Sequence, residues 1–344
     1  MMILCGALLA AGCASVRERT DAVREKYGRG GMKNETEQEQ DQAIEQDPEA
    51  SETEAEEVPD ESVSESETEL PDPSDEADAQ PEEEPKEPLA KYDEILTVNP
   101  YVAGWLTIDD SVIDDPVVYT PKSQNYFLHR DIDGSNASKG TLFIAVDWQE
   151  GYHNTLIYGH NMKDGSGFGS LAKFADESYG MSHPVLHFDT LYEEQDYQLL
   201  AAFYSQIDEE ELETEEDRKE ADEAIKQETI EKKEEAGEIV PAEPGETAPP
   251  VELTLFDIDL TQDFGGVDLY RQEKDEDAGR FRYYYYTDLA DRGDFDYYVQ
   301  NVKERALYDT GVDAEWGDDL ITLSTCSYQV RNGRFVVVGV KKNR

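Results

Sequence analysis

Two neighbouring runs of β-branched residues near the C-terminus constrain the fold of this 344-residue chain most strongly. They are Leu320–Ser327, which reads LITLSTCS, and Arg334–Val340, which reads RFVVVGV. Val, Ile, Thr and Phe fit a pleated, half-buried surface, so both runs predict strands. The segment between them ends in Asn332-Gly333, a dipeptide typical of tight turns. We therefore expect a hairpin that places Cys326 at the end of one strand and Arg334 at the start of the next.

Short apolar runs of the same kind recur in the preceding part of the chain. Strands are expected over Val102–Ile108, Asp115–Tyr119, Gly140–Val146, Asn154–Tyr158, Val185–Phe188 and Tyr197–Tyr204. Helices are expected over Leu89–Leu96, Phe168–Ala175 and Asp288–Tyr308. Many short strands joined by Gly, Asp and Asn turns predict a mostly β fold, either a barrel or a sandwich.

The charge of the chain is extreme and unevenly distributed. It has 30 basic and 81 acidic residues, a net charge of −51. Residues 32–90 hold 24 acidic residues against 2 lysines, and residues 208–246 hold 18 acidic against 5 basic residues. A polyanion repels phosphates, so the composition excludes a general nucleic-acid-binding surface. The remainder of the chain is only moderately acidic and has the composition of a globular domain.

These shifts in composition divide the chain into three parts. Residues 1–16 are apolar and predict a membrane anchor or a lipoprotein-like leader; the second alternative rests on Leu9–Cys13, which resembles a lipobox with Cys13 as the lipidated residue. A buried core helix is a third interpretation. Residues 17–88 cannot bury enough apolar area to fold and predict an acidic, disordered linker. Residues 89–344 predict the folded domain, with an acidic surface insertion at 208–279.

The folded part contains a single thiol, Cys326. A leftover cysteine in an exported chain indicates a reactive thiol or an intermolecular disulfide, and the alternative is a small buried apolar residue. A reactive thiolate needs a nearby histidine or cation. His160 follows the predicted strand Asn154–Tyr158, and Arg334 can donate hydrogen bonds to an oxyanion. Only the fold can bring His160 close to the thiol.

The other four histidines are expected to have structural roles: His129, His153, His183 and His187. The chain has no HExxH or His-x-His spacing and no second cysteine in the folded part. A zinc site is therefore not expected, and the prediction is that the protein needs no metal or other cofactor.

Several of these segments match one known family. Tyr158–Met162, reading YGHNM and followed by Phe168–Leu171, resembles the histidine motif of the class B sortases. Thr322–Cys326 resembles the sortase TLxTC motif, and Arg334–Val337 resembles the strand that carries the sortase arginine. The opening strands and the segment Phe281–Tyr286 are also similar. The resemblance covers about Tyr92 to Val340, apart from the acidic insertion.

The resemblance implies an eight-stranded sortase-type β-barrel with an N-terminal helix and a helix between strands six and seven. It implies a transpeptidase in which Cys326 attacks the C-terminal sorting signal of a secreted protein and forms a thioester. His160 would transfer protons, Arg334 would hold the substrate or the oxyanion, and Thr325 would contact the substrate. A peptide amine of a cell-wall precursor would accept the acyl group. The resemblance also implies a location at the cell surface, in a cell envelope of the Gram-positive type, with the catalytic domain anchored to the membrane and lying outside the cell.

Two other interpretations stay open on the sequence. A hydrolytic cysteine peptidase would use the same thioester and release it with water. A non-enzymatic surface binding protein would use the acidic segments themselves as its functional part.

Overall fold

The computed structural model of the chain describes residues 86–145, 148, 152–207, 215–239, 251, 253–261, 281–329 and 331–341. The predicted leader at 1–16 and nearly all of the predicted linker at 17–88 lie outside these residues. In the part that is described, no helix is both long and apolar enough to cross a membrane. The boundaries of the three predicted parts stay predictions.

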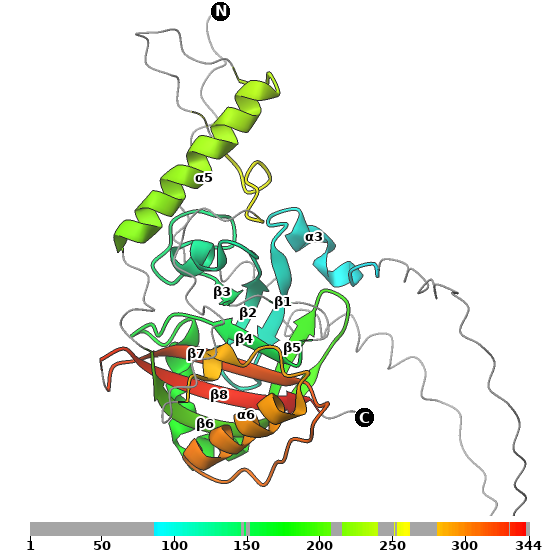
Figure 1. Ribbon diagram of the computed structural model, residues 1–344, viewed down its shortest axis with the longest axis vertical. Coiled ribbons are helices and arrows are strands. Elements are labelled where there is room, and N and C mark those ends of the chain that lie inside the picture. The colour runs from blue at the N-terminus through cyan, green and yellow to red at the C-terminus, as the bar shows by residue number, and fades with distance from the viewer. Residues whose placement is uncertain are drawn as a thin grey trace, which may run out of the picture. The chain divides into compact units, whose positions relative to one another are not determined.

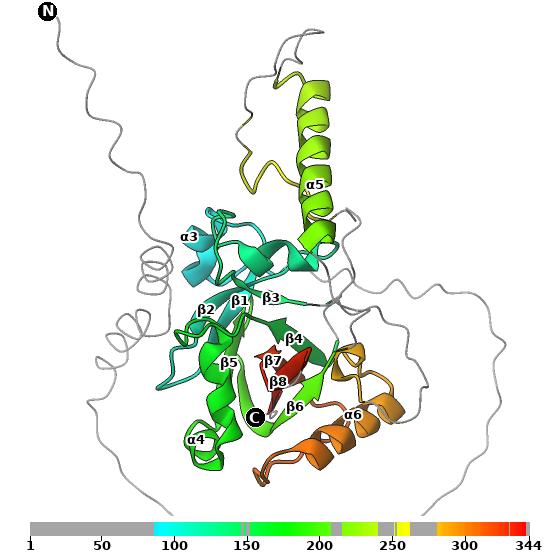
Figure 2. The same ribbon diagram turned by 90° about the vertical axis from the view of Figure 1, so that its left-hand side faces the viewer.

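The described strands close into one barrel in the order β1-β2-β3-β4-β7-β8-β6-β5 (Figure 1 and Figure 2). Their bounds are β1 Val102–Thr107, β2 Asp114–Val118, β3 Leu142–Ile144, β4 Asn154–Tyr158, β5 Val185–Thr190, β6 Asp196–Gln206, β7 Leu320–Ser327 and β8 Gly333–Lys341. Neighbours are antiparallel except for the pairs β2–β3 and β4–β7, which are parallel. The predicted mostly β fold, an eight-stranded barrel, is confirmed.

The hairpin predicted at the C-terminus forms as expected. β7 has the predicted bounds, and β8 is one residue longer at each end than the predicted strand. Asn332 has a φ of 55°, in the left-handed region that asparagine tolerates better than most residues. The turn sets the register so that Ser327 pairs with Gly333 and Cys326 pairs with Arg334.

Helix α6, Arg292–Arg305, lies between β6 and β7 in the chain and covers the barrel wall (Figure 1). Asp291 caps its start by accepting hydrogen bonds from the backbone N–H groups of Gly293 and Asp294, so the helix begins later than the predicted Asp288. Its buried residues recur at helical spacing on one face: Phe295, Tyr298, Val299 and Val302. The predicted helix between strands six and seven is confirmed.

A buried chain of hydrogen bonds fixes α6 to the two parallel strands β7 and β4. The Tyr298 hydroxyl lies 2.6 Å from Thr322 Oγ1, and Thr322 donates to Asn154 Oδ1 at 2.8 Å. Asn154 in turn donates from Nδ2 to the Tyr286 carbonyl at 2.7 Å. Because buried polar groups are costly to leave unpaired, this network specifies how the helix and both strands meet.

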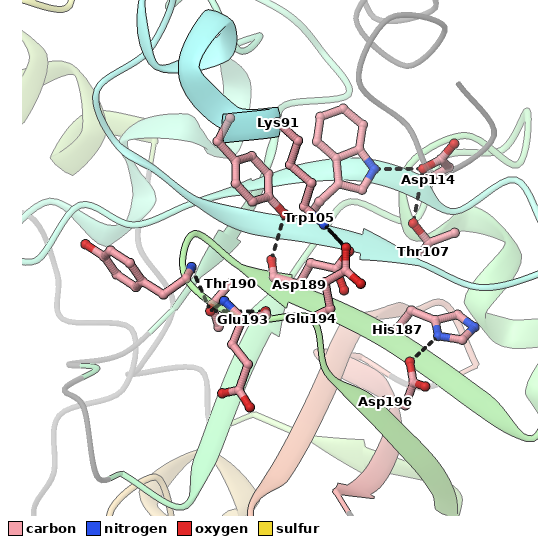
Figure 3. A network of polar contacts seen from close by, with 12 residues as sticks. Lys91, Trp105, Thr107, Asp114, His187, Asp189, Thr190, Glu193, Glu194 and Asp196 are labelled. Carbon is pink, nitrogen blue, oxygen red and sulfur yellow. Dashed lines mark hydrogen bonds and ion pairs between the residues drawn. The ribbon is translucent and has the colours of Figure 1, made fainter. Parts of the chain in front are cut away.

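The expected N-terminal helix forms as two short pieces, a 3₁₀ turn η1 (Ala90–Tyr92) and one α-helical turn α3 (Asp93–Leu96). Lys91 Nζ pairs with Asp189 at 3.1 Å and with Glu194 at 2.6 Å, and Tyr92 donates to the Asp189 carbonyl at 3.2 Å. Figure 3 shows this polar network, together with the Trp105–Asp114 and His187–Asp196 contacts nearby. The N-terminal segment is thus fixed to β5.

The remaining described helices are short, with one exception. They are η2 Gln124–His129, η3 Phe168–Ala175, α4 Glu177–Ser182, α5 Glu215–Glu235 and η5 Tyr283–Tyr285. The helix predicted at Phe168–Ala175 is a 3₁₀ helix. The long helix α5 and residues 253–261 belong to the predicted acidic insertion.

The described parts of the insertion contact the rest of the domain. Ile225 on α5 is 4% exposed, Leu255 is 6% exposed and Leu260 is fully buried. The Tyr101 hydroxyl donates to the Ile258 carbonyl at 2.5 Å and accepts from the Leu260 N–H at 3.1 Å. These contacts fix residues 253–261 beside the start of β1.

The Tyr298 network makes a prediction about stability. Tyr298→Phe removes the hydroxyl that donates to Thr322 and should lower the free energy of unfolding by about 1–2 kcal/mol. Urea denaturation followed by tryptophan fluorescence measures it. The control is Tyr192→Phe, at a 47% exposed tyrosine whose hydroxyl bonds no other described residue. Equal midpoints for the two variants would show that the network adds nothing to stability.

Candidate active site

The barrel places Cys326 and Arg334 directly opposite each other on β7 and β8. Residues opposite each other in an antiparallel pair have their side chains on the same face of the sheet. Cys326 is half-buried and has a free thiol, and Arg334 is 5% exposed. The Arg334 guanidinium donates a hydrogen bond from Nη1 to the Gly333 carbonyl at 3.0 Å. A thiol and a nearly buried cation therefore lie side by side.

Tyr158, the last residue of β4, connects these two groups. Its hydroxyl lies 2.8 Å from Cys326 Sγ. The guanidinium carbon of Arg334 lies 5.6 Å from the centre of the Tyr158 ring, within the range of a cation–π contact. Tyr158 itself is 4% exposed. Sequence reasoning did not select Tyr158 as a site residue, although it belongs to the YGHNM motif; its place beside the thiol depends on the pairing of β4 with β7.

Hydrogen bonds continue from β4 to β7 beyond the regular ladder. Tyr158 pairs with Ser324, and the Gly159 N–H donates to the Ser324 carbonyl at 3.2 Å. Asn161 Nδ2 then donates to the Cys326 carbonyl at 2.7 Å. The backbone on both sides of His160 is therefore bonded to the strand that carries the thiol.

Thr325 also takes part in this junction. Its side chain is fully buried, and its hydroxyl donates to the Gly159 carbonyl at 2.6 Å. The geometry thus gives Thr325 the role of tying the ends of β4 and β7 together. Its predicted contact with substrate stays a prediction.

The His160 imidazole is oriented by a different part of the domain. It hydrogen-bonds to the backbone carbonyl of Leu128, and its ring packs on that of His129 with centroids 4.9 Å apart. Within the described residues, Nε2 of His160 is buried without a hydrogen-bond partner, and no hydrogen bond joins His160 to Cys326. The structure therefore places the two residues on adjoining strand ends but does not join their side chains.

Burial lowers the pKa of His160, and the positive charge of Arg218 lowers it further, whereas the hydrogen bond to Leu128 raises it. Desolvation disfavours the charged form of an imidazole, so the neutral ring is favoured. A neutral imidazole can accept a proton from a thiol or an amine.

A buried tyrosine also contacts the strand that carries the thiol. The Tyr283 hydroxyl lies 2.7 Å from Ser324 Oγ. Burial raises the pKa of Tyr283 to about 12, although the nearby Arg334 opposes this effect. The hydroxyl thus stays protonated and bonded to β7 two residues before the thiol. Tyr283 belongs to the 3₁₀ turn η5, which holds the first three residues of the run Tyr283–Tyr286.

The three other histidines are held by local partners. His153 pairs with Asp319 at 2.9 Å, His187 with Asp196 at 2.6 Å, and His183 stacks on Tyr179 at 3.9 Å. In the described ranges, no group of three or more His, Cys, Asp or Glu side chains is arranged to hold a metal ion.

No protein-family model matches the chain. Sortase B of Listeria monocytogenes is 25% identical over 250 residues, which is 72% of this chain and 72% of that protein. Sortase B of Staphylococcus aureus is 24% identical over 115 residues, covering 33% of this chain and 47% of that protein. The chain is a homologue of sortase B. The similarity supports a cysteine transpeptidase of the sortase type.

A solved structure of sortase B from B. anthracis in complex with AAEK1 is 24% identical, with a TM-score of 0.47. The alignment covers 76% of this chain and 90% of that one.

The contact between Tyr158 and the thiol makes a prediction about reactivity. A hydroxyl at 2.8 Å stabilises a thiolate by donating to it. Tyr158→Phe should therefore slow alkylation of Cys326 by iodoacetamide at neutral pH by about tenfold, corresponding to a lost bond of roughly 1.4 kcal/mol. Mass spectrometry of the peptide that contains Cys326 separates this reaction from those of Cys5 and Cys13.

The matched control is Tyr328→Phe. Tyr328 lies two residues beyond Cys326 and is 73% exposed, and its hydroxyl donates to the Asn161 carbonyl rather than to the thiol. Alkylation in this variant should keep the wild-type rate. Equal alkylation rates in the two variants would show that Tyr158 does not activate the Cys326 thiol.

Proposed function

We propose that the chain is a transpeptidase that cleaves the C-terminal sorting signal of secreted proteins and joins them to a peptide amine of the cell wall. Cys326 is the nucleophile, His160 the proton-transfer group and Arg334 the electrophilic residue. The observation that carries this proposal is the pairing of Cys326 with Arg334 across β7 and β8, with the Tyr158 hydroxyl on the sulfur. The similarity of the chain to sortase B supports the class of reaction, transpeptidation through a thioester.

In the first half-reaction, the Cys326 sulfur forms a bond to the carbonyl carbon of the scissile peptide, and the thiol proton passes to neutral His160. The carbonyl oxygen gains the negative charge, and Arg334 donates hydrogen bonds to it. As the C–N bond breaks, the His160 imidazolium returns its proton to the leaving amine. A thioester on Cys326 remains.

In the second half-reaction, the incoming amine attacks the thioester carbonyl, and His160 takes the proton that the amine loses. The C–S bond breaks, and the thiolate leaves beside the Tyr158 hydroxyl. His160 must come within hydrogen-bond reach of the reacting atoms. Catalytic hydrogen bonds often form only when substrate is bound.

The site favours this chemistry because Arg334 is nearly buried. A guanidinium that is 5% exposed interacts with a developing oxyanion more strongly than one in open solvent. Its planar donors also match two oxygens at once, which an ammonium group does not.

We also propose that the catalytic domain works at the cell surface. Residues 1–16 would attach it to the membrane, and residues 17–88 would hold it away from the membrane by mutual repulsion of their acidic side chains. This location fits a substrate that is secreted and an acceptor amine in the wall.

A peptide panel tests the proposed function. The full chain should cleave one of a set of fluorogenic peptides carrying LPxTG-, SPxTG- and NPxTN-like motifs, and should ligate the acyl fragment to an added amine. Mass spectrometry identifies the ligated product. Cys326→Ala should abolish both products. Cleavage without any ligation would show that the protein is a hydrolytic peptidase and not a transpeptidase. No turnover of any peptide, together with a Cys326 thiol that does not react with a thiol reagent, would favour a binding protein.

The role of Arg334 has its own test. Arg334→Lys keeps the positive charge but loses the planar fork, so kcat/KM should fall by about a hundredfold, a change of roughly 3 kcal/mol. Arg331→Lys, on the adjoining turn, should have no effect of that size. A kcat/KM for Arg334→Lys close to wild type would exclude bidentate binding of the substrate or the oxyanion.

A further inference from the structure

A second histidine lies against the candidate catalytic one. The rings of His129 and His160 are 4.9 Å apart between centroids, and their planes are inclined by 36°. The residue before His129, Leu128, supplies the carbonyl to which the His160 ring hydrogen-bonds. Both contacts come from η2, so this one 3₁₀ helix holds the imidazole through its ring face and through a nitrogen.

The helix η2 is itself firmly placed. Phe127 is fully buried, and its carbonyl accepts from the Thr141 N–H at 3.1 Å just before β3. The His129 carbonyl accepts from the Ala137 N–H at 2.8 Å. A Cβ added at Gly140, whose φ is 65°, would lie 2.2 Å from the Leu128 carbonyl oxygen. Only glycine allows the chain to approach η2 this closely.

The insertion helix α5 contacts the end of η2. Arg130, the residue after His129, pairs with Asp222 of α5 at 2.7 Å. The Arg130 guanidinium also lies 4.0 Å from the centre of the Tyr126 ring and donates to the Tyr126 carbonyl at 2.7 Å. In both views the lower end of α5 lies beside the teal turn of η2 (Figure 1 and Figure 2).

The proposed function has no role for this arrangement. We propose that His129 is a positioning residue for His160, held in place by η2 and by the docked helix α5. Packing of its ring against the His160 imidazole fixes the orientation of that imidazole. The inference rests on the proposed role of His160 in proton transfer. It gives the insertion a role in the reaction that does not require contact with substrate.

The electrostatics of the pair agree with this role. Burial and then the charge of Arg218 on α5 lower the pKa of both histidines, and His129 is brought to about 4. His129 therefore remains uncharged at neutral pH and does not compete with His160 for a proton. The charges of His160 and Arg130 also lower the pKa of His129, after the effects of burial and Arg218.

Kinetics of His129 variants test the positioning role. His129→Ala removes the packed ring and should lower kcat by about tenfold with little change in KM, because misorientation of a proton-transfer group acts on the chemical step. His129→Phe keeps an aromatic ring in the same place and should restore most of kcat. A kcat for His129→Ala equal to wild type would overturn the proposal, as would a Phe variant no better than Ala.

Histidine titration gives a readout that needs no substrate. In the full chain labelled with ¹³C-histidine, Arg218→Gln should raise the titration midpoints of His129 and His160 by roughly half a pH unit, since a like charge is removed. Lys226→Gln removes the same charge from an exposed position on α5 and should leave both midpoints unchanged. Unchanged midpoints in Arg218→Gln would overturn the role of α5.

The two experiments separate the two proposals. If the wild-type protein turned over no peptide, the proposed function would fail. The His160 signal would still report on the contact, because His129→Ala should change its chemical shift and titration and His129→Phe should not. A His160 signal insensitive to both changes would overturn the positioning role whatever the activity.

Discussion

The parallel pairing of β4 with β7 is the constraint on which the site depends. Because Tyr158 pairs with Ser324, the residues that follow each strand emerge at the same edge of the barrel. β4 continues into His160, and β7 carries Cys326 two residues beyond Ser324. The junction is fixed by the Thr325 hydroxyl and the Asn161 amide, which bond the two strand ends to each other. A shift of one residue in this register would turn Tyr158 away from the thiol, since successive side chains alternate between faces.

The same pairing explains why so much polar chemistry is buried under the site. Thr322, Ser324 and Thr325 on β7 are all fully buried. Their hydroxyls bond to Asn154, to Tyr283 and to the Gly159 carbonyl. An apolar strand would pack equally well, but it would not determine which residues of β4 and η5 it meets. Buried hydroxyls must each find a hydrogen-bond partner, so they select a single arrangement of the strands and η5. The site is built from three separate segments and therefore requires a single arrangement of them.

The C-terminal half of the site could be predicted from sequence because its determinants are local. Cys326 and Arg334 are eight positions apart within one hairpin, and an Asn-Gly turn sets its register. His160 could be identified only from its motif, because its distance from the thiol depends on a pairing across more than 160 residues. The signal for Tyr158 was present in the same motif, two residues before the histidine. His129 carried no such signal, since η2 has no periodic pattern and its contact with His160 arises from packing alone.

The insertion shows a second limit of sequence reasoning. Residues 208–246 are strongly acidic, and from composition α5 would be expected to stabilise a charged imidazole nearby. Yet the α5 side chain that affects the pKa of both histidines is a cation, Arg218, and its effect is the opposite.

On a helix each residue is turned by about 100° from the next. The neighbours Asp217 and Lys219 therefore project in different directions from Arg218. The sign of the field at the histidines is set by which face of α5 docks, and the position of Asp222 and Ile225 on that face determines it. The net charge of the insertion describes how it interacts with solvent, whereas the residues on its docked face determine the electrostatic effect on the pKa values of the two histidines.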